Sequence, residues 1–334
     1  MSTKLKLSIL DQSPVSGEET PAQALANTTT LAQKADAWGY HRYWVSEHHN
    51  TELLAGSSPE ILIAHLAANT KRIRLGSGGV MLPHYSSYKV AENFNLLSTL
   101  HPNRIDLGIG RAPGTDSPAI YALNKGNGNY DAYHFPKQIA ELKAYTTGAV
   151  DTQAGHLEAS PIPDTAPPIW VLSSSGFGAD HAARQGVGFA FAHFINPMGG
   201  PEAMQAYFQH FNPGKEGAKP AGLFCIFVHC ADTMEKAEEL QHTMDLVMLY
   251  VETGRKLRLQ SYEELKKIPL SPMEQARIQQ NRHRMVFGTP EVVKEKLENL
   301  AEQYGTDEMM IVTITHDFKD RLRSYELLAE AFEL

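Results

Sequence analysis

The residues with the clearest capacity for chemistry form the stretch Glu47-His48-His49, a carboxylate next to two imidazoles. They follow residues 42–46, whose aromatic and branched side chains predict a β-strand. Imidazole exchanges protons near neutral pH, so Glu47 and His48 are candidate catalytic residues for acid–base chemistry. The residue types alone leave a simpler interpretation open, in which these groups only complete hydrogen bonds at a strand end.

A metal centre is a second alternative for this cluster. The histidines that could supply zinc ligands are His48, His49, His84, His101, His181 and His193. They form no H-x-H or H-E-x-x-H pattern with companion carboxylates, so we expect no metal site.

Two further stretches could bind an anion. Arg111 ends the predicted strand 104–109 and its guanidinium suits a phosphate or a carboxylate. Residues 173–178, Ser-Ser-Ser-Gly-Phe-Gly, lead from a strand at 168–173 into a helix, whose first N–H groups attract anions. Each feature alone has a plainer explanation, a solvated arginine or a helix N-cap. The two strands follow one another in the expected sheet, however, so both features could hold one phosphate.

A glycine-rich stretch, Gly76-Ser77-Gly78-Gly79, ends the predicted strand 72–78. Glycines at this place let a flat ligand approach the backbone closely, or permit an unusual peptide geometry. A β-bulge is the alternative explanation.

Strands and helices alternate along the whole chain. Strands are predicted at 5–10, 42–46, 72–78, 104–109, 168–173, 187–192, 222–230 and 308–314. Later helices are predicted near 87–100, 136–146, 178–186, 201–211, 290–304 and 319–332. The first helix should begin after Thr20 and stop at Gly39, and the second should open with a capping box from Ser57 to Glu60. This alternation predicts an α/β fold, a (β/α)8 TIM barrel.

We expect residues 1–334 to form a single domain, because barrels of this kind reach that length. Two stretches break the alternation, at 111–135 and at 252–288. We interpret both as irregular loop or lid insertions at the C-terminal face of the barrel, where barrel enzymes place their active sites.

The net charge and the residue pattern of the chain argue against several classes of function. With a net charge of −8 and no concentrated basic stripe, the chain is not expected to bind nucleic acid. We find no signal peptide and no apolar stretch long enough to span a membrane. Cys225 and Cys230, five residues apart in one predicted strand, should be buried thiols on opposite faces. We therefore expect a cytoplasmic protein.

In their order along the chain, these strand ends resemble the bacterial luciferase-like monooxygenase family. The resemblance rests on Glu-His-His at 47–49, Gly-Ser-Gly-Gly-Val-Met-Leu-Pro at 76–83, Gly-Arg-Ala-Pro-Gly-Thr-Asp at 110–116 and Ser-Ser-Ser-Gly-Phe at 173–177. It implies a barrel with an insertion near the seventh strand, in agreement with the break at 252–288. It also implies that reduced FMN reacts with dioxygen, with His48 managing protons.

The resemblance assigns cofactor contacts residue by residue. Arg111 and the serine-glycine stretch would hold the FMN phosphate, and Gly78-Gly79, through a cis peptide, would press against the flavin ring. The full set of cofactor contacts is Ser77, Gly78, Gly79, Arg111, Leu172, Ser173, Ser174, Ser175, Gly176 and Phe177. The light-emitting luciferase subunit carries a cysteine where this chain has Gly110 and a carboxylate where it has Ser174, which argues against light emission.

We therefore predict a flavin-dependent oxidoreductase, a monooxygenase that acts on an unidentified small organic substrate. Reduced FMN would come from a separate flavin reductase, because the sequence has no nicotinamide fingerprint. The resemblance also makes a homodimer possible. Alternatives are a non-catalytic protein that stores FMN, a deazaflavin-dependent oxidoreductase and, more distantly, a metal-dependent barrel hydrolase.

Overall fold

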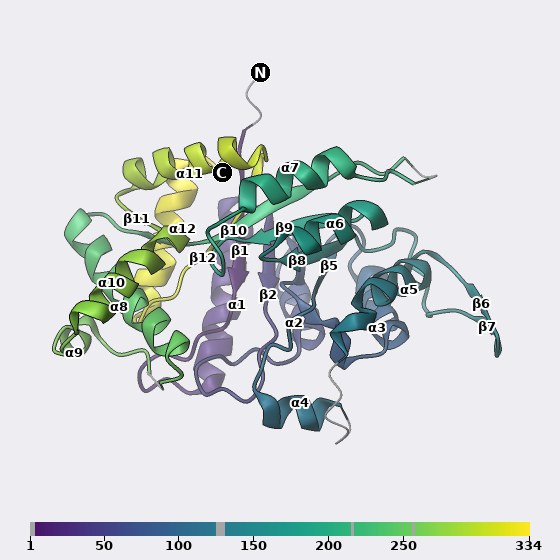
Figure 1. Cartoon of the computed structure of the whole chain (residues 1–334), viewed down its shortest axis with the longest axis horizontal. Coiled ribbons are helices and arrows are strands. Elements are labelled where there is room, and N and C mark those ends of the chain that lie inside the picture. The colour runs from purple at the N-terminus through teal and green to yellow at the C-terminus, as the bar shows by residue number, and fades with distance from the viewer. Residues whose placement is uncertain (1–3, 125–130, 215–216, 256–257) are drawn as a thin grey trace.

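Eight parallel strands close into the inner wall of a (β/α)8 barrel (Figure 1). The computed structural model describes residues 4–124, 131–214, 217–255 and 258–334. The barrel strands are β1 (Lys6–Asp11), β2 (Arg42–Val45), β3 (Arg74–Ser77), β5 (Ile105–Gly110), β8 (Ile169–Ser173), β9 (Gly188–Ala192), β10 (Gly222–Cys230) and β12 (Glu308–Val312). Pairing of β9 with β10 and of β12 with β1 closes the ring. The predicted barrel is confirmed, and each strand overlaps its predicted range.

Helices surround this wall on the outside (Figure 1). The long helices are α1 (Pro21–Trp38), α2 (Pro59–Asn69), α3 (Ser87–Leu100), α5 (Phe135–Thr147), α6 (Gly176–Gln185), α7 (Gly200–His210), α8 (Met234–Glu252), α11 (Pro290–Tyr304) and α12 (Phe318–Ala331). None of the described helices is long and apolar enough to cross a membrane.

The ends of the first helix follow the sequence signals. The Thr20 side chain caps α1, and Gly39 ends it in the left-handed conformation with φ of 96°. The capping box predicted from Ser57 to Glu60 is wrong. Helix α2 begins at Pro59 after the N-cap Ser58, so Ser57 precedes the cap and the required spacing of three residues is lost.

The two stretches that break the alternation contain short regular elements. The first holds α4 (Ser117–Leu123) and a 3-10 turn, η2 (Ala132–His134), while residues 125–130 of this stretch lie outside the described residues. The second holds α9 (Tyr262–Leu265), α10 (Pro272–Asn281), η3 (Arg282–Arg284) and β11 (Met285–Gly288), which pairs with β10. Capping boxes at the starts of α9 and α10 explain why these helices form in a polar stretch.

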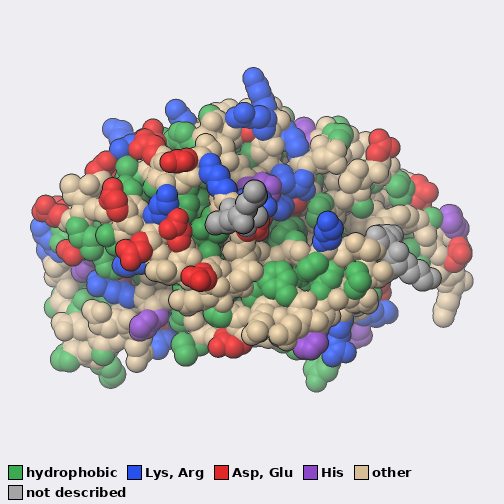
Figure 2. All heavy atoms as spheres, turned by 90° about the horizontal axis from the view of Figure 1, so that it is seen from above, with side chains coloured by type: hydrophobic (Ala, Val, Ile, Leu, Met, Phe, Trp, Pro, Cys, Tyr) green, Lys and Arg blue, Asp and Glu red, His purple; other side chains and the backbone are tan. Residues whose placement is uncertain are grey.

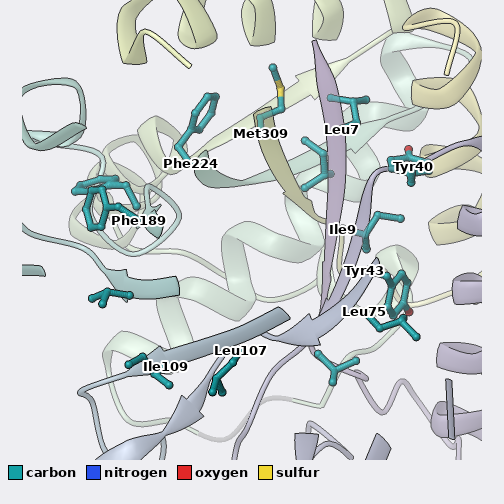
Figure 3. Close-up of a cluster of buried hydrophobic side chains, with 14 of the residues drawn as sticks. Leu7, Ile9, Tyr40, Tyr43, Leu75, Leu107, Ile109, Phe189, Phe224 and Met309 are labelled. Carbon is teal, nitrogen blue, oxygen red and sulfur yellow. The ribbon is translucent and has the colours of Figure 1, made fainter. Parts of the chain in front are cut away.

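Alternation along the strands separates two apolar layers. In β10, Leu223, Cys225 and Phe227 belong to the cluster inside the barrel, whereas Phe224 and Cys230 pack outward with the helices. Figure 3 shows part of this outer layer, in which side chains from several strands point toward the helices. The prediction of two buried thiols on opposite faces is confirmed.

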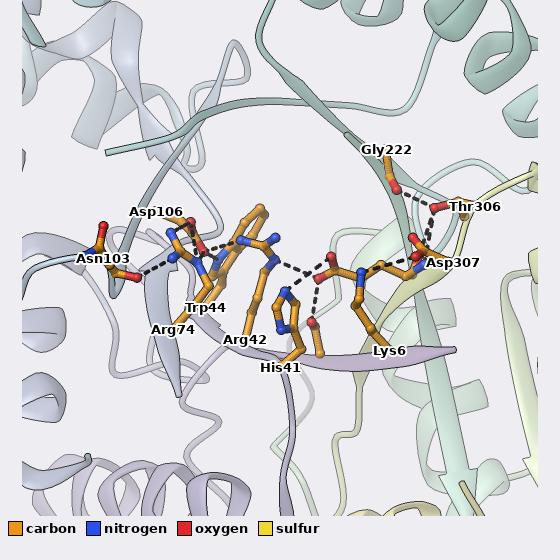
Figure 4. A network of polar contacts seen from close by, with 12 residues as sticks. Lys6, His41, Arg42, Trp44, Arg74, Asn103, Asp106, Gly222, Thr306 and Asp307 are labelled. Carbon is orange, nitrogen blue, oxygen red and sulfur yellow. Dashed lines mark hydrogen bonds and ion pairs between the residues drawn. The ribbon is translucent and has the colours of Figure 1, made fainter. Parts of the chain in front are cut away.

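A charged network fills the N-terminal end of the barrel (Figure 4). The guanidinium of Arg42 bridges Asp106 and Glu308, at 2.8 Å from an oxygen of each. The Trp44 indole N–H donates to Asp106 over 3.1 Å. Burial alone would raise the pKa of Asp106, but the charges of Arg42 and Arg74 hold it below its usual value. The network fixes this end of the barrel as a scaffold.

On the outer face nearest the N-terminus, acidic and basic side chains are interspersed (Figure 2).

Four further small elements lie outside the ring. Strand β4 (Val80–Met81) pairs with β5, and the 3-10 turn η1 (Leu82–His84) follows it directly. Strands β6 (Val150–Thr152) and β7 (Gly155–Leu157) form an antiparallel hairpin that projects away from the barrel (Figure 1). Strand β4 directly continues the glycine-rich stretch that follows β3.

Candidate active site

A cavity of about 300 Å³ lies at the C-terminal ends of the strands. Most of the site residues predicted from the sequence line it, namely Glu47, His48, Gly78, Gly79, Arg111, Leu172, Ser173, Ser174 and Ser175. The strand-end rule for barrels therefore brings together residues that are more than 120 positions apart in sequence.

The inner walls of the cavity are apolar. Leu172 of β8 pairs in register with Ala190 of β9, which pairs in turn with Leu223 of β10, so the three side chains form a continuous wall. Cys225 and Met310 extend this lining. A wall of this kind suits a flat, apolar ring and offers little to a highly charged ligand.

The glycine-rich stretch forms another wall and contains the expected cis peptide bond, between Gly78 and Gly79. A Cβ atom on Gly78 would lie 2.5 Å from the Leu10 side chain, and one on Gly79 would lie 2.9 Å from the Gly108 carbonyl oxygen. Close packing of the barrel therefore requires glycine at both positions, whatever the ligand. Ser77, which the sequence analysis gave as a cofactor contact, is not among the residues that line the cavity. Its buried hydroxyl donates to the Gly108 carbonyl over 2.7 Å.

Arg111 and the start of α6 form a cationic rim on one side of the cavity. The Arg111 guanidinium lies 4.5 Å from the centre of the Phe177 ring. No carboxylate pairs with Arg111 in the described part of the chain, and its side chain is exposed. Ser175 is the N-cap residue of α6, but its hydroxyl contacts Ser173 instead of capping the helix. The positive charge and the first N–H groups of α6 are thus available to an anion.

Gly176 and Phe177 occupy the outside of this rim and do not line the cavity. A Cβ atom on Gly176 would meet no atom within 4 Å, so open space adjoins the first turn of α6. Phe177 is 46% exposed, and the Arg111 guanidinium lies over its ring. Their role as direct cofactor contacts stays a prediction, and the contact that the structure shows for Phe177 is with Arg111.

His48 lies against the cavity with one ring nitrogen fixed. Its Nδ1 atom is 3.0 Å from the Ser46 hydroxyl oxygen, which leaves Nε2 without a partner among the described residues. Burial, together with the nearby His49, lowers the pKa of His48 to about 4. The imidazole is therefore neutral at physiological pH, with one ring nitrogen protonated and the other able to accept a hydrogen bond.

The carboxylate of Glu47, by contrast, is fully engaged by the protein. One oxygen lies 2.8 Å from His49 Nε2 and 2.7 Å from the Tyr85 hydroxyl, and the other accepts the Met81 backbone N–H over 3.0 Å. Glu47 is 2% exposed. These contacts agree with the simpler interpretation of Glu47 as a residue that completes hydrogen bonds at a strand end.

Residues after β9 also line the cavity, although no motif drew attention to them. Phe194 and Ile195 belong to the lining, and the Asn196 side chain donates to the Ser174 carbonyl over 3.0 Å. The signal for them was the strand-end rule, applied to the predicted strand 187–192. Ser46, which contacts His48 Nδ1, is the last residue of the predicted strand 42–46, and the sequence analysis assigned it no role.

Several of the described basic side chains of the second insertion are paired with acids. Arg255 contacts Glu274, and Arg282 contacts Asp245, at 2.8 Å and 2.7 Å. From the same insertion, Leu259 packs into the cluster inside the barrel, and its carbonyl accepts the Gly17 N–H over 2.7 Å. These two contacts of Leu259 attach the insertion to the interior of the barrel and to the loop after β1. No group of three or more histidine, cysteine or acidic side chains within the described ranges could hold a metal ion.

Comparison with known proteins identifies close relatives along the whole chain. A family model described as luciferase-like monooxygenase matches residues 5–308. The uncharacterised protein YwcH of Bacillus subtilis is 53% identical over 98% of this chain and 99% of its own length. The N-acetyl-S-alkylcysteine monooxygenase of the same organism is 38% identical over 98% of both chains.

Solved structures share the same architecture. The crystal structure of apo-MsnO8 is 38% identical, with a TM-score of 0.91 and 99% of both chains covered. Two more distant structures show the fold alone. They are the oxygenating constituent of 3,6-diketocamphane monooxygenase of Pseudomonas putida in complex with FMN (18% identity, 98% and 97% covered, TM-score 0.70) and an F420-dependent secondary alcohol dehydrogenase (13%, 99% of both, 0.68). Together, the family match and the identity over the full length show that this chain belongs to the luciferase-like monooxygenase family.

Proposed function

We propose that this protein is a monooxygenase that uses reduced FMN and dioxygen to oxidise a small organic substrate. The observation that carries the proposal is the position of Arg111 and the start of α6 at the rim of an apolar cavity. A phosphate would compensate the charge of Arg111 and accept the free N–H groups, and a flat ring would contact the apolar walls. FMN combines these two chemical features in one molecule.

The described residues fit FMN group by group. Arg111, Ser173 to Ser175 and the first turn of α6 would hold the phosphate, with the open space beside Gly176 available to it. Leu172 and the wall of Gly78 and Gly79 would contact the ring. A reduced deazaflavin also carries a phosphate and a flat ring. The identity of 38% to a named monooxygenase favours oxygen chemistry and therefore FMN.

Bound reduced FMN would supply two electrons to dioxygen, so that one oxygen atom enters the substrate and the other leaves as water. The chain itself contributes binding, exclusion of water and proton handling. Apolar side chains limit water in the cavity. His48 is neutral and held by Ser46, so its Nε2 can hold or deliver a proton beside the reacting groups. A separate reductase would supply the reduced FMN.

The thioether named for the Bacillus subtilis relative provides a first substrate to test. With N-acetyl-S-methylcysteine, chemically reduced FMN and ¹⁸O₂, we expect a product that contains one ¹⁸O atom, detected by mass spectrometry. The same mixture without protein is the control for spontaneous oxidation of the sulfide. If a wider panel of small sulfides, ketones and aldehydes also gives no labelled product while FMN binds, the protein is a flavin carrier and the monooxygenase proposal fails.

A further inference from the structure

The Glu47 clamp, defined here as Glu47 with its partners His49, Met81 and Tyr85, joins two loops at the barrel mouth. Glu47 and His49 belong to the loop after β2, whereas Met81 lies in β4 and Tyr85 follows η1. Both carboxylate oxygens are used, one by His49 and Tyr85 and the other by the Met81 N–H. A buried carboxylate with three donors is costly to replace, so it fixes the spacing of the two loops.

The clamp is attached directly to two walls of the cavity. Met81 lines the cavity and is two residues from the cis peptide at Gly78 and Gly79. His48, on the other loop, lies between the two clamp residues Glu47 and His49. Any shift of the clamp would therefore move the glycine wall relative to the His48 ring.

A third loop is packed against the clamp from the other side. Gly114, in the loop after β5, has φ of 63°, and a Cβ atom there would lie 2.9 Å from the Met81 side chain and 3.0 Å from the Glu47 carbonyl. The Thr115 hydroxyl donates to the His49 carbonyl over 3.0 Å. The same loop begins with Arg111, so the clamp also contacts the loop that carries the phosphate rim.

We propose that Glu47 is a positioning residue, whose buried carboxylate sets the glycine wall and His48 at the spacing that the oxidation requires. The inference rests on the proposed function and assigns Glu47 no proton transfer. Burial raises the pKa of the Tyr85 phenol, and the neighbouring Glu47 charge adds to this shift, so Tyr85 remains a donor to the carboxylate.

Hydrogen exchange of the ligand-free protein tests the clamp without any cofactor. In Glu47→Ala the Met81 amide loses its acceptor, so we expect the peptide that contains it to exchange about tenfold faster or more. Glu47→Gln retains one acceptor oxygen and should restore part of the protection. Glu92→Gln, a carboxylate paired with Lys89 on α3, is the matched control and should leave this peptide unchanged. Unchanged exchange in Glu47→Ala would overturn the clamp.

FMN binding and turnover then test the positioning role. We expect Glu47→Ala to bind FMN within about threefold of the wild-type affinity, because the phosphate rim is separate, but to show a changed absorbance spectrum of the bound flavin. Its kcat for the sulfide should fall about tenfold or more, with recovery in Glu47→Gln. Tyr85→Phe should show a smaller effect in the same direction. A wild-type spectrum and kcat in Glu47→Ala would refute positioning, whereas absence of FMN binding in the wild type would refute the proposed function alone.

Discussion

Replacement of Asp11 by alanine should lower the free energy of unfolding by about 3–5 kcal/mol, the largest effect on stability that we expect from one substitution. Asp11, at the end of β1, and Arg321, in α12, are both buried, and the guanidinium nitrogen lies 2.5 Å from the carboxylate. Burial would raise the pKa of Asp11, but the Arg321 charge and a hydrogen bond from Tyr43 hold it below its usual value. Without Asp11, a buried arginine charge remains uncompensated.

A surface ion pair provides the control for this measurement. Lys6 and Asp307 are separated by 3.1 Å but are 47% and 44% exposed, so Asp307→Ala should cost only about 0–1 kcal/mol. Urea denaturation followed by circular dichroism would give both values under one condition. Similar losses in the two variants would contradict the assigned role of the Asp11 pair.

Replacement of His48 by glutamine should lower kcat for the sulfide about 100-fold, because glutamine fills a similar space but cannot exchange a proton. FMN affinity should change little, since the phosphate rim does not include His48. In the wild type, the lowered pKa of about 4 keeps the imidazole neutral above that pH. The kcat of the wild type should therefore stay constant between neutral pH and about pH 5. It should fall as the pH drops through about 4, where His48 becomes protonated.

Ser46→Ala separates the orientation of His48 from its presence. This variant removes the contact to Nδ1 and should lower kcat less than His48→Gln does. If His48→Gln instead turns over at the wild-type rate while it binds FMN, the histidine has no catalytic role. A flavin store, or a proton path through bound water alone, would then account better for the site.

The sequence was sufficient to predict the barrel and most of the candidate residues that line the cavity, because both depend on local patterns. Alternation of apolar runs places the eight strands, and the rule that parallel strands end at one edge brings His48 together with Arg111 and Ser174. The capping signals at Thr20 and Gly39 act within one turn of helix and were also interpreted correctly.

What could not be predicted depends on contacts between distant segments. Ser77 is turned away from the cavity by the Gly108 carbonyl on the neighbouring strand, and the role of Phe177 depends on where the Arg111 side chain lies. The engagement of Glu47 by Met81 and Tyr85 joins positions 34 and 38 residues away, with no sequence signal for either contact. The second insertion also contains two short helices, α9 and α10, that were not predicted. Each begins with the Ser-x-x-Glu signature of a capping box, at 261 and at 271, and this signature could have identified both helices.

The most direct test of FMN binding at this site compares FMN with riboflavin in fluorescence titrations of the wild type, Arg111→Ala and the control Arg258→Ala. The two flavins differ only in the phosphate, and charge-assisted hydrogen bonds contribute about 1.5–3 kcal/mol each. We expect the wild type and Arg258→Ala to bind FMN at least about tenfold more tightly than riboflavin, and Arg111→Ala to lose most of this preference. Equal affinities of the wild type for both flavins, or a preference that survives in Arg111→Ala, would contradict the assignment of this rim as the phosphate site.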